Sequence, residues 1–127
     1  MIKQTGYTLF EYMYRDASNY KAWGQLLLAG QSYPSDIAAL RSTLDSGEYF
    51  VAEQVGVPAL YEVLWKFTNG STDDDHCFHE YVELRAATDD EITKLPVWGS
   101  VAKFVSTFTT VKSWNCNLSP NRQNLVW

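Results

Sequence analysis

The chain has 127 residues and a net charge of −5, and its length fits one domain spanning residues 1–127. Hydrophobic residues make up 46% and aromatic residues 15% of the sequence, a composition that excludes intrinsic disorder. No apolar run approaches the about 20 residues that cross a bilayer, and the first residues lack a signal-peptide pattern. We therefore expect a cytoplasmic protein without a membrane partner.

The charge is distributed unevenly along the chain. All 15 acidic residues lie in residues 1–91, where the net charge is −9, and residues 92–127 carry a net charge of +4. Because an acidic protein repels phosphate, binding to duplex nucleic acid is not expected. The acidic surface of one copy can instead meet the basic surface of another, which favours a homo-oligomer.

Residues 7–15 and 20–30 predict two strands that are rich in aromatic residues. Asp16, Ser18 and Asn19 lie between them, and these side chains favour turns because they hydrogen-bond to nearby backbone. We therefore expect residues 16–19 to connect an antiparallel hairpin. Alternation places one set of side chains of the first strand on one face (Thr8, Phe10, Tyr12, Tyr14) and the other set on the opposite face (Leu9, Glu11, Met13, Arg15).

Two helices are predicted in the next part of the chain. Residues 32–47 begin with Pro34 in the first turn and end at Gly47, with apolar residues at helical spacing between them. Residues 57–70 repeat this pattern from Pro58 to Asn69 and Gly70. Residues 48–56, between the two helices, fit either a short strand or an irregular packing segment.

A third strand is predicted over residues 76–86, where alternation would place Cys77, His79, Tyr81, Glu83 and Arg85 on one face. Residues 88–91 form a capping-box pattern before a short helix that ends at Pro96. Residues 97–111 predict a last helix, although their Thr and Val residues leave a strand open as the alternative. The fold class is α+β, a small antiparallel sheet with helices packed on one face.

Three stretches resemble a group of small bacterial proteins: YRDASNYK at residues 14–21, DDHCFHEYVEL at residues 74–84 and LPVWGSV at residues 95–101. The similarity covers most of the chain. It implies no activity, so the functional reading depends on the residues themselves.

Residues 73–83 hold both histidines, one of the two cysteines and five carboxylates. Zinc would need ligands that converge tetrahedrally, but neighbouring odd and even positions of a strand diverge. Only Cys77 and His79 share a face, with Cys116 as a third candidate, and no metal-binding motif supports the set. We therefore expect no metal and no cofactor. A Cys77–Cys116 disulfide is not expected in a reducing compartment.

Two hypotheses assign a catalytic or a ligand-binding role to residues of this region. His79 could act as a general base with Glu83, while Arg15 or Lys21 stabilises an anion, although no nucleophile motif accompanies them. A sheet face with Trp23 and Tyr81 could stack a nucleotide. The candidate ligand-binding residues are Arg15, Lys21, Trp23, His79, Tyr81 and Glu83. The competing interpretation is that aromatic pairs fill the core and stabilise the sheet.

Protein binding is the remaining hypothesis, and it is the one we prefer. Tyr, Trp and Arg dominate protein interfaces, and the acids Asp73, Asp74 and Asp75 could steer the chain onto a partner with a basic surface. The sequence therefore predicts a small cytosolic, non-catalytic binding protein that inhibits or regulates a partner by occluding or sequestering it. The alternative is a nucleotide or small-anion binding protein, which leaves open an enzyme that acts on phosphate esters.

Overall fold

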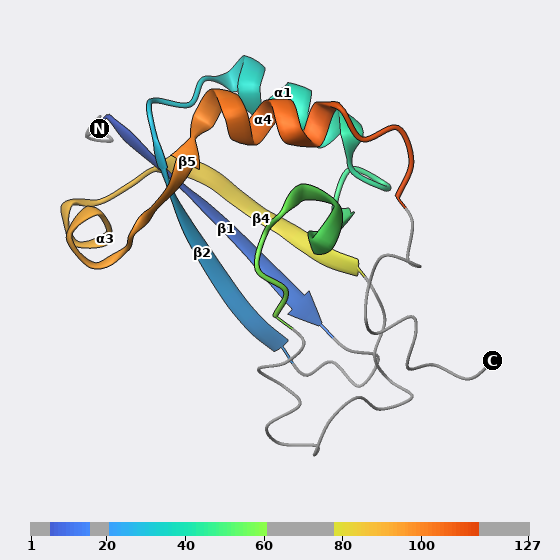
Figure 1. The fold of residues 1–127 in the computed structure, drawn as a ribbon, viewed down its shortest axis with the longest axis horizontal. Coiled ribbons are helices and arrows are strands. Elements are labelled where there is room, and N and C mark those ends of the chain that lie inside the picture. The colour runs from blue at the N-terminus through green and yellow to red at the C-terminus, as the bar shows by residue number, and fades with distance from the viewer. Residues whose placement is uncertain (1–5, 16–20, 61–77, 115–127) are drawn as a thin grey trace.

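The computed structural model describes residues 6–15, 21–60 and 78–114. Over these residues the fold is a five-stranded sheet with three α-helices (Figure 1). In chain order the elements are β1 (Tyr7–Arg15), β2 (Lys21–Ala29), α1 (Pro34–Thr43), β3 (Tyr49–Val51), the 3-10 turn η1 (Ala52–Val55), β4 (Phe78–Ala86), α3 (Asp89–Lys94), β5 (Val97–Ser100) and α4 (Val101–Thr109). The α+β class predicted from the sequence is confirmed. Within the described ranges, no helix is long and apolar enough to cross a bilayer.

The sheet has the strand order β3-β4-β1-β2-β5, so β1 is central. β1 pairs antiparallel with β2 along its whole length, from Tyr7 opposite Ala29 to Arg15 opposite Lys21. The two strands of the expected hairpin therefore pair as predicted, whereas their connection, residues 16–20, lies outside the described residues. β4 pairs antiparallel with both β1 and β3.

The prediction of a purely antiparallel sheet is wrong at one edge, where β5 runs parallel to β2. Residues 97–111 were expected to form one helix, but the helix begins only at Val101. Ser100 sets this boundary, because its Oγ accepts a hydrogen bond from the Lys103 N–H at 3.1 Å. The residues before this cap are extended and add a strand to the sheet.

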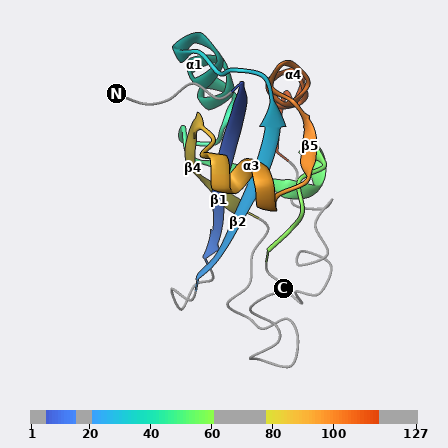
Figure 2. The same ribbon diagram turned by 90° about the vertical axis from the view of Figure 1, so that its left-hand side faces the viewer.

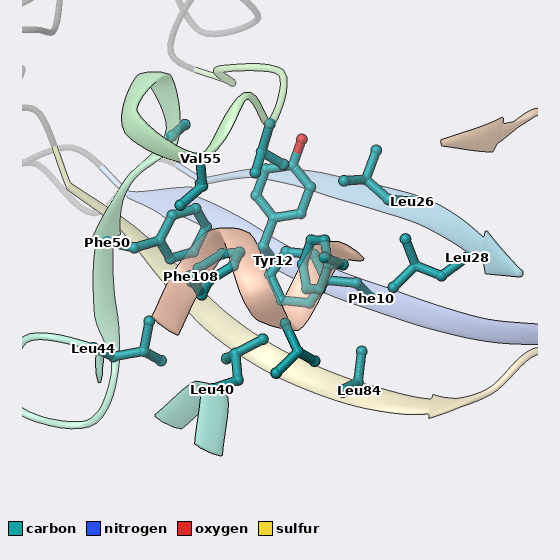
Figure 3. Close-up of a cluster of buried hydrophobic side chains, with 14 of the residues drawn as sticks. Phe10, Tyr12, Leu26, Leu28, Leu40, Leu44, Phe50, Val55, Leu84 and Phe108 are labelled. Atoms are coloured by element: carbon teal, nitrogen blue, oxygen red, sulfur yellow. The ribbon is translucent and has the colours of Figure 1, made fainter. Parts of the chain in front are cut away.

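The core lies between one face of the sheet and the helices α1 and α4, which lie side by side (Figure 1). Phe10 is at its centre: its ring stacks on Tyr12 at 5.2 Å between centroids and meets Phe104 of α4 at 4.7 Å. Figure 3 shows side chains of β1, β2 and β4 converging with Leu40 of α1 and Phe108 of α4. We call this side of the sheet the helix-covered face.

The opposite face of the sheet is partly covered by α3, so the expectation that all helices pack on one face is wrong for this helix (Figure 2). Leu9 and Leu27 form a small second cluster with Ala87, and Ile92 and Leu95 pack against it. The capping box predicted for this helix is confirmed, with Thr88 Oγ1 accepting from the Glu91 N–H at 3.2 Å. We call this side the open face, because beyond α3 it carries the exposed side chains of β1, β2 and β4.

The segment after η1 is held on the helix-covered face by Tyr12. The Tyr12 hydroxyl donates a hydrogen bond of 2.6 Å to the Pro58 carbonyl, and burial raises the pKa of this phenol. A Cβ atom at Gly24 would lie 2.7 Å from the Tyr12 ring, so the bare backbone of Gly24 makes room for that ring. The helix expected over residues 57–70 lies mostly outside the described residues; residues 57–60 themselves are not helical.

We expect Tyr12→Phe to lower the free energy of unfolding by about 1–3 kcal/mol, because the Pro58 carbonyl loses its donor in a partly buried setting. Urea unfolding of the two proteins measures this difference. Tyr33→Phe is the matched control, since it removes a hydroxyl from a side chain that is 55% exposed and should cost less than about 0.5 kcal/mol. Equal stabilities for Tyr12→Phe and the unmodified protein would contradict the assignment.

Candidate functional site

The six candidate ligand-binding residues do not gather at one place. His79 and Tyr81 lie on the helix-covered face, where Tyr81 packs against the core and Arg41 of α1 lies 5.3 Å from its ring centroid. Arg15, Lys21, Trp23 and Glu83 lie on the open face. A pocket lined by all six is therefore excluded by the sheet itself.

An irregularity in β4 explains why the alternation expected for this strand is wrong. The register with β1 shifts between Glu11 and Tyr12, so that Glu11 is opposite Glu83 while Tyr12 is opposite Tyr81. Val82 is the extra residue of this bulge, and a bulge reverses the face on which the following side chains lie. Consequently Glu83 and Arg85 lie on the open face, away from His79.

His79 is fully buried and serves the fold. Its Nε2 accepts a hydrogen bond of 2.9 Å from the Leu60 N–H, and its ring lies 5.2 Å from that of Tyr14 and 5.9 Å from that of Phe50. An Nε2 that accepts this bond has no lone pair left to take a substrate proton. The suggested general-base pair of His79 with Glu83 is therefore wrong, because the two side chains are on opposite faces and His79 Nε2 is occupied.

The cationic end of the open face is formed by Arg15 and Lys21, which are direct cross-strand neighbours. Arg15 pairs with Glu80 at 3.4 Å between Nε and Oε2. The Arg15 side chain is 42% exposed, and a pair of this kind adds at most about 1 kcal/mol. Trp23 follows on β2, opposite Met13, and is 57% exposed.

The acidic end of the open face is organised around Arg85. Its Nη2 lies 2.7 Å from Glu91 Oε2, and its Nη1 donates to the other oxygen of the same carboxylate at 2.9 Å. Glu83 lies 3.6 Å from Arg85 Nε, and Glu11 adds a further favourable charge. The hydrogen bond from Arg85, helped by Thr88, lowers the pKa of Glu91 to about 2, and the same bond raises the pKa of Arg85.

Metal binding finds no support in residues 6–15, 21–60 and 78–114, which contain no group of three His, Cys, Asp or Glu side chains that could hold an ion. His76, Cys77 and Cys116, which the sequence offers as further ligands, lie outside the described residues. Asp73, Asp74 and Asp75, the acids expected to contact a partner, lie outside them as well.

Comparisons with known proteins add no functional information. No protein-family model, curated protein or solved structure matches this chain.

Sequence reasoning missed the Arg85–Glu91 pair and the position of Trp23. The capping box did place Glu91 at the start of α3, but its second role as the partner of Arg85 depends on how α3 folds back onto the sheet. The sequence interpretation placed Trp23 on the same sheet face as Tyr81, although alternation across the paired strands puts it on the opposite face. Period-two alternation along the second strand is the signal that could have shown this. Trp23 is four residues from Leu27 and therefore shares its face.

We expect Glu91→Gln to lower the free energy of unfolding by about 1.5–3 kcal/mol at pH 7, because a partly buried, charge-assisted pair is lost. The folded pKa of Glu91, about 2, lies below its ordinary value of 4.5. The stabilisation is therefore fully present above about pH 5 and is lost as the pH falls through 4.5 toward 2. Urea unfolding of both proteins at several pH values should show their difference shrinking over that range.

The matched control for this experiment is Asp90→Asn on the same helix. Asp90 pairs with Lys94 at 3.3 Å, but both side chains are highly exposed, so the loss should stay below about 1 kcal/mol. A difference between Glu91→Gln and the unmodified protein that does not change with pH would contradict the assigned pairing.

Proposed function

We propose that this protein is a small, non-catalytic cytoplasmic binding protein that inhibits or regulates another protein by docking the acidic end of its open face onto a basic surface. The observation that carries the proposal is the surplus of carboxylates around Arg85. Glu91 neutralises this guanidinium with two hydrogen bonds, while Glu83 is held nearby with its side chain 53% exposed. The Glu83 carboxylate therefore leaves negative charge at the surface, on a sheet to which the Arg85–Glu91 pair holds α3.

The acids of α3 extend this surface. Asp89 and Asp90 lie in the first turn of the helix, directly after the residues that end β4, and both are exposed. Carboxylates in a first helical turn are favoured by the helix dipole, so they stabilise α3 as well as adding charge. Complementary charge of this kind speeds association and selects among partners more than it adds affinity.

A binding role is favoured over a catalytic one by the state of the polar side chains. The histidine of the described part is buried and bonded, and the arginines of the open face are engaged with Glu80 and Glu91. These groups hold the sheet and α3 together. The nucleotide or small-anion alternative is less well supported, because its two aromatic residues lie on opposite faces: Tyr81 on the helix-covered face and Trp23 on the open face.

We expect Glu83→Lys to abolish capture of the partner, because it replaces an exposed carboxylate with a cation at the centre of the proposed docking surface. Tagged full-length protein is used for affinity capture from its own cells, and captured proteins are quantified by mass spectrometry. The predicted loss is at least about ten-fold, and raising the salt concentration should weaken capture by the unmodified protein.

Glu48→Lys is the matched control, since it makes the same charge change at an exposed site between α1 and β3 and should leave capture unchanged. Thermal melts establish that both variants are folded. A set of captured proteins that Glu83→Lys retains at the same level as Glu48→Lys would refute docking through this surface.

A further inference from the structure

The edge of the sheet at β2 is only half covered. β5 pairs with Leu27, Leu28 and Ala29 at the end of β2, whereas the described residues provide no strand beside Lys21–Leu26. The three side chains of this stretch that lie on the open face, those of Lys21, Trp23 and Gln25, are exposed. A half-covered edge strand offers backbone groups to any extended chain that can pair with it.

The backbone hydrogen bonds determine which groups of β2 point outward. The Gly30 N–H donates to the Gly6 carbonyl at 2.8 Å, and hydrogen-bonded pairs alternate along an antiparallel ladder. The even-numbered residues of β2 therefore bond to β1, and the odd-numbered residues direct their N–H and C=O groups away from it. This assignment agrees with β5, which takes up the outward groups around Leu27 and Ala29.

The outward backbone groups at the start of β2 thus belong to Lys21, Trp23 and Gln25. Among the described residues, none forms a hydrogen bond to these groups. The same three residues present their side chains on the open face. The edge consequently combines unpaired backbone with an exposed tryptophan at its middle position, which is the arrangement used when a strand is added to a sheet.

The charges along this edge indicate what would pair with it. Lys21 lies opposite Arg15 at one end, and Gln25 lies opposite Glu11 at the other, where its Nε2 donates to Glu11 Oε2 at 3.4 Å. Within the described part of the chain, neither Lys21 nor Glu11 forms an ion pair. The edge is therefore cationic at one end and anionic at the other, with Trp23 between them.

A pattern of this kind is complementary to itself when the strand is reversed. Antiparallel pairing of two copies about a two-fold axis at Trp23 sets Lys21 of one copy opposite Gln25 of the other. In that other copy, Glu11 of β1 lies beside Gln25 of β2. Its Cα atom is therefore two strand spacings, about 10 Å, from the Cα atom of Lys21, and the two charged side chains can meet across this distance. No like charges face each other across this pairing. The edge is therefore complementary to itself, as an isologous contact between two copies requires.

We propose that the Lys21–Gln25 edge of β2 pairs with the same edge of a second copy of this chain, joining the two sheets across a two-fold axis at Trp23. Lys21, Trp23 and Gln25 of each copy exchange backbone hydrogen bonds with the other, and the two Trp23 side chains meet on the open face. The pairing ends at Leu26, because β5 already occupies the edge from Leu27. This inference does not rest on the proposed docking partner, because its backbone pairing uses only Lys21, Trp23 and Gln25 of the β2 edge. Glu11, which lies opposite both Gln25 and Glu83, is the one residue that the two surfaces share.

The test is a charge-exchange experiment on the purified full chain, with the dimer Kd measured by analytical ultracentrifugation between about 1 µM and about 1 mM. Lys21→Glu and Glu11→Lys should each raise the Kd at least about ten-fold, because each sets like charges together across the axis. The double variant should return the Kd to within about three-fold of the unmodified value. Residues 11 and 21 lie about 13 Å apart within one chain, so this rescue has to occur between copies.

Two further variants keep the outcome interpretable. Lys103→Glu makes the same charge change at an exposed site on α4 and should leave the Kd unchanged. Gln25→Pro removes an outward N–H without touching the ladder to β1, and it should weaken the dimer without involving charge. Circular dichroism shows whether each variant is folded. A monomer at every concentration, or single-variant losses that add up in the double variant, would overturn the proposal.

Discussion

The position of β1 between β2 and β4 is the constraint on which the rest of the structure depends. Its even-numbered residues bond to β2 and face the helices, and its odd-numbered residues bond to β4 and lie on the open face. A one-residue slip would expose Phe10, Tyr12 and Tyr14 and bury Glu11 and Arg15, so the register is strongly specified. The core, the open face and the direction of the free β2 edge all follow from this alternation.

Two polar side chains on the helix-covered face hold the segment that follows η1 in place. Tyr12 bonds to the Pro58 carbonyl and His79 receives the Leu60 N–H, so two side chains of neighbouring strands hold the same segment. The Tyr12 hydroxyl and His79 Nε2 each bond to a backbone group, which offsets the cost of placing these polar atoms in the core. His79 was a candidate general base from the sequence, and in the structure it supports the packing of this segment.

The open face carries charges that are neutralised to different degrees. Arg15 and Arg85 are held by carboxylates within the sheet and α3, whereas Glu83 and Lys21 remain available at the surface. The two ends of the face therefore differ in sign, and each supports its own proposal: a basic partner at the α3 end and a second copy at the β2 edge. Trp23 belongs to the second of these, because it lies between the edge charges.

The sequence by itself determined the elements that depend on local chemistry. The paired strands around residues 16–20, the helix after Pro34 and the capping box at Thr88 and Glu91 were all predicted, because alternation and capping act within a few residues. The tertiary structure decided what depends on distant partners. The bulge at Val82 places His79 and Glu83 on opposite faces of the sheet. The parallel pairing of β5 with β2 joins segments about 70 residues apart in the chain, so local sequence patterns did not predict it. Whether a side chain such as His79 or Arg85 reacts, binds or supports the fold is settled by those partners, and they are remote in the chain.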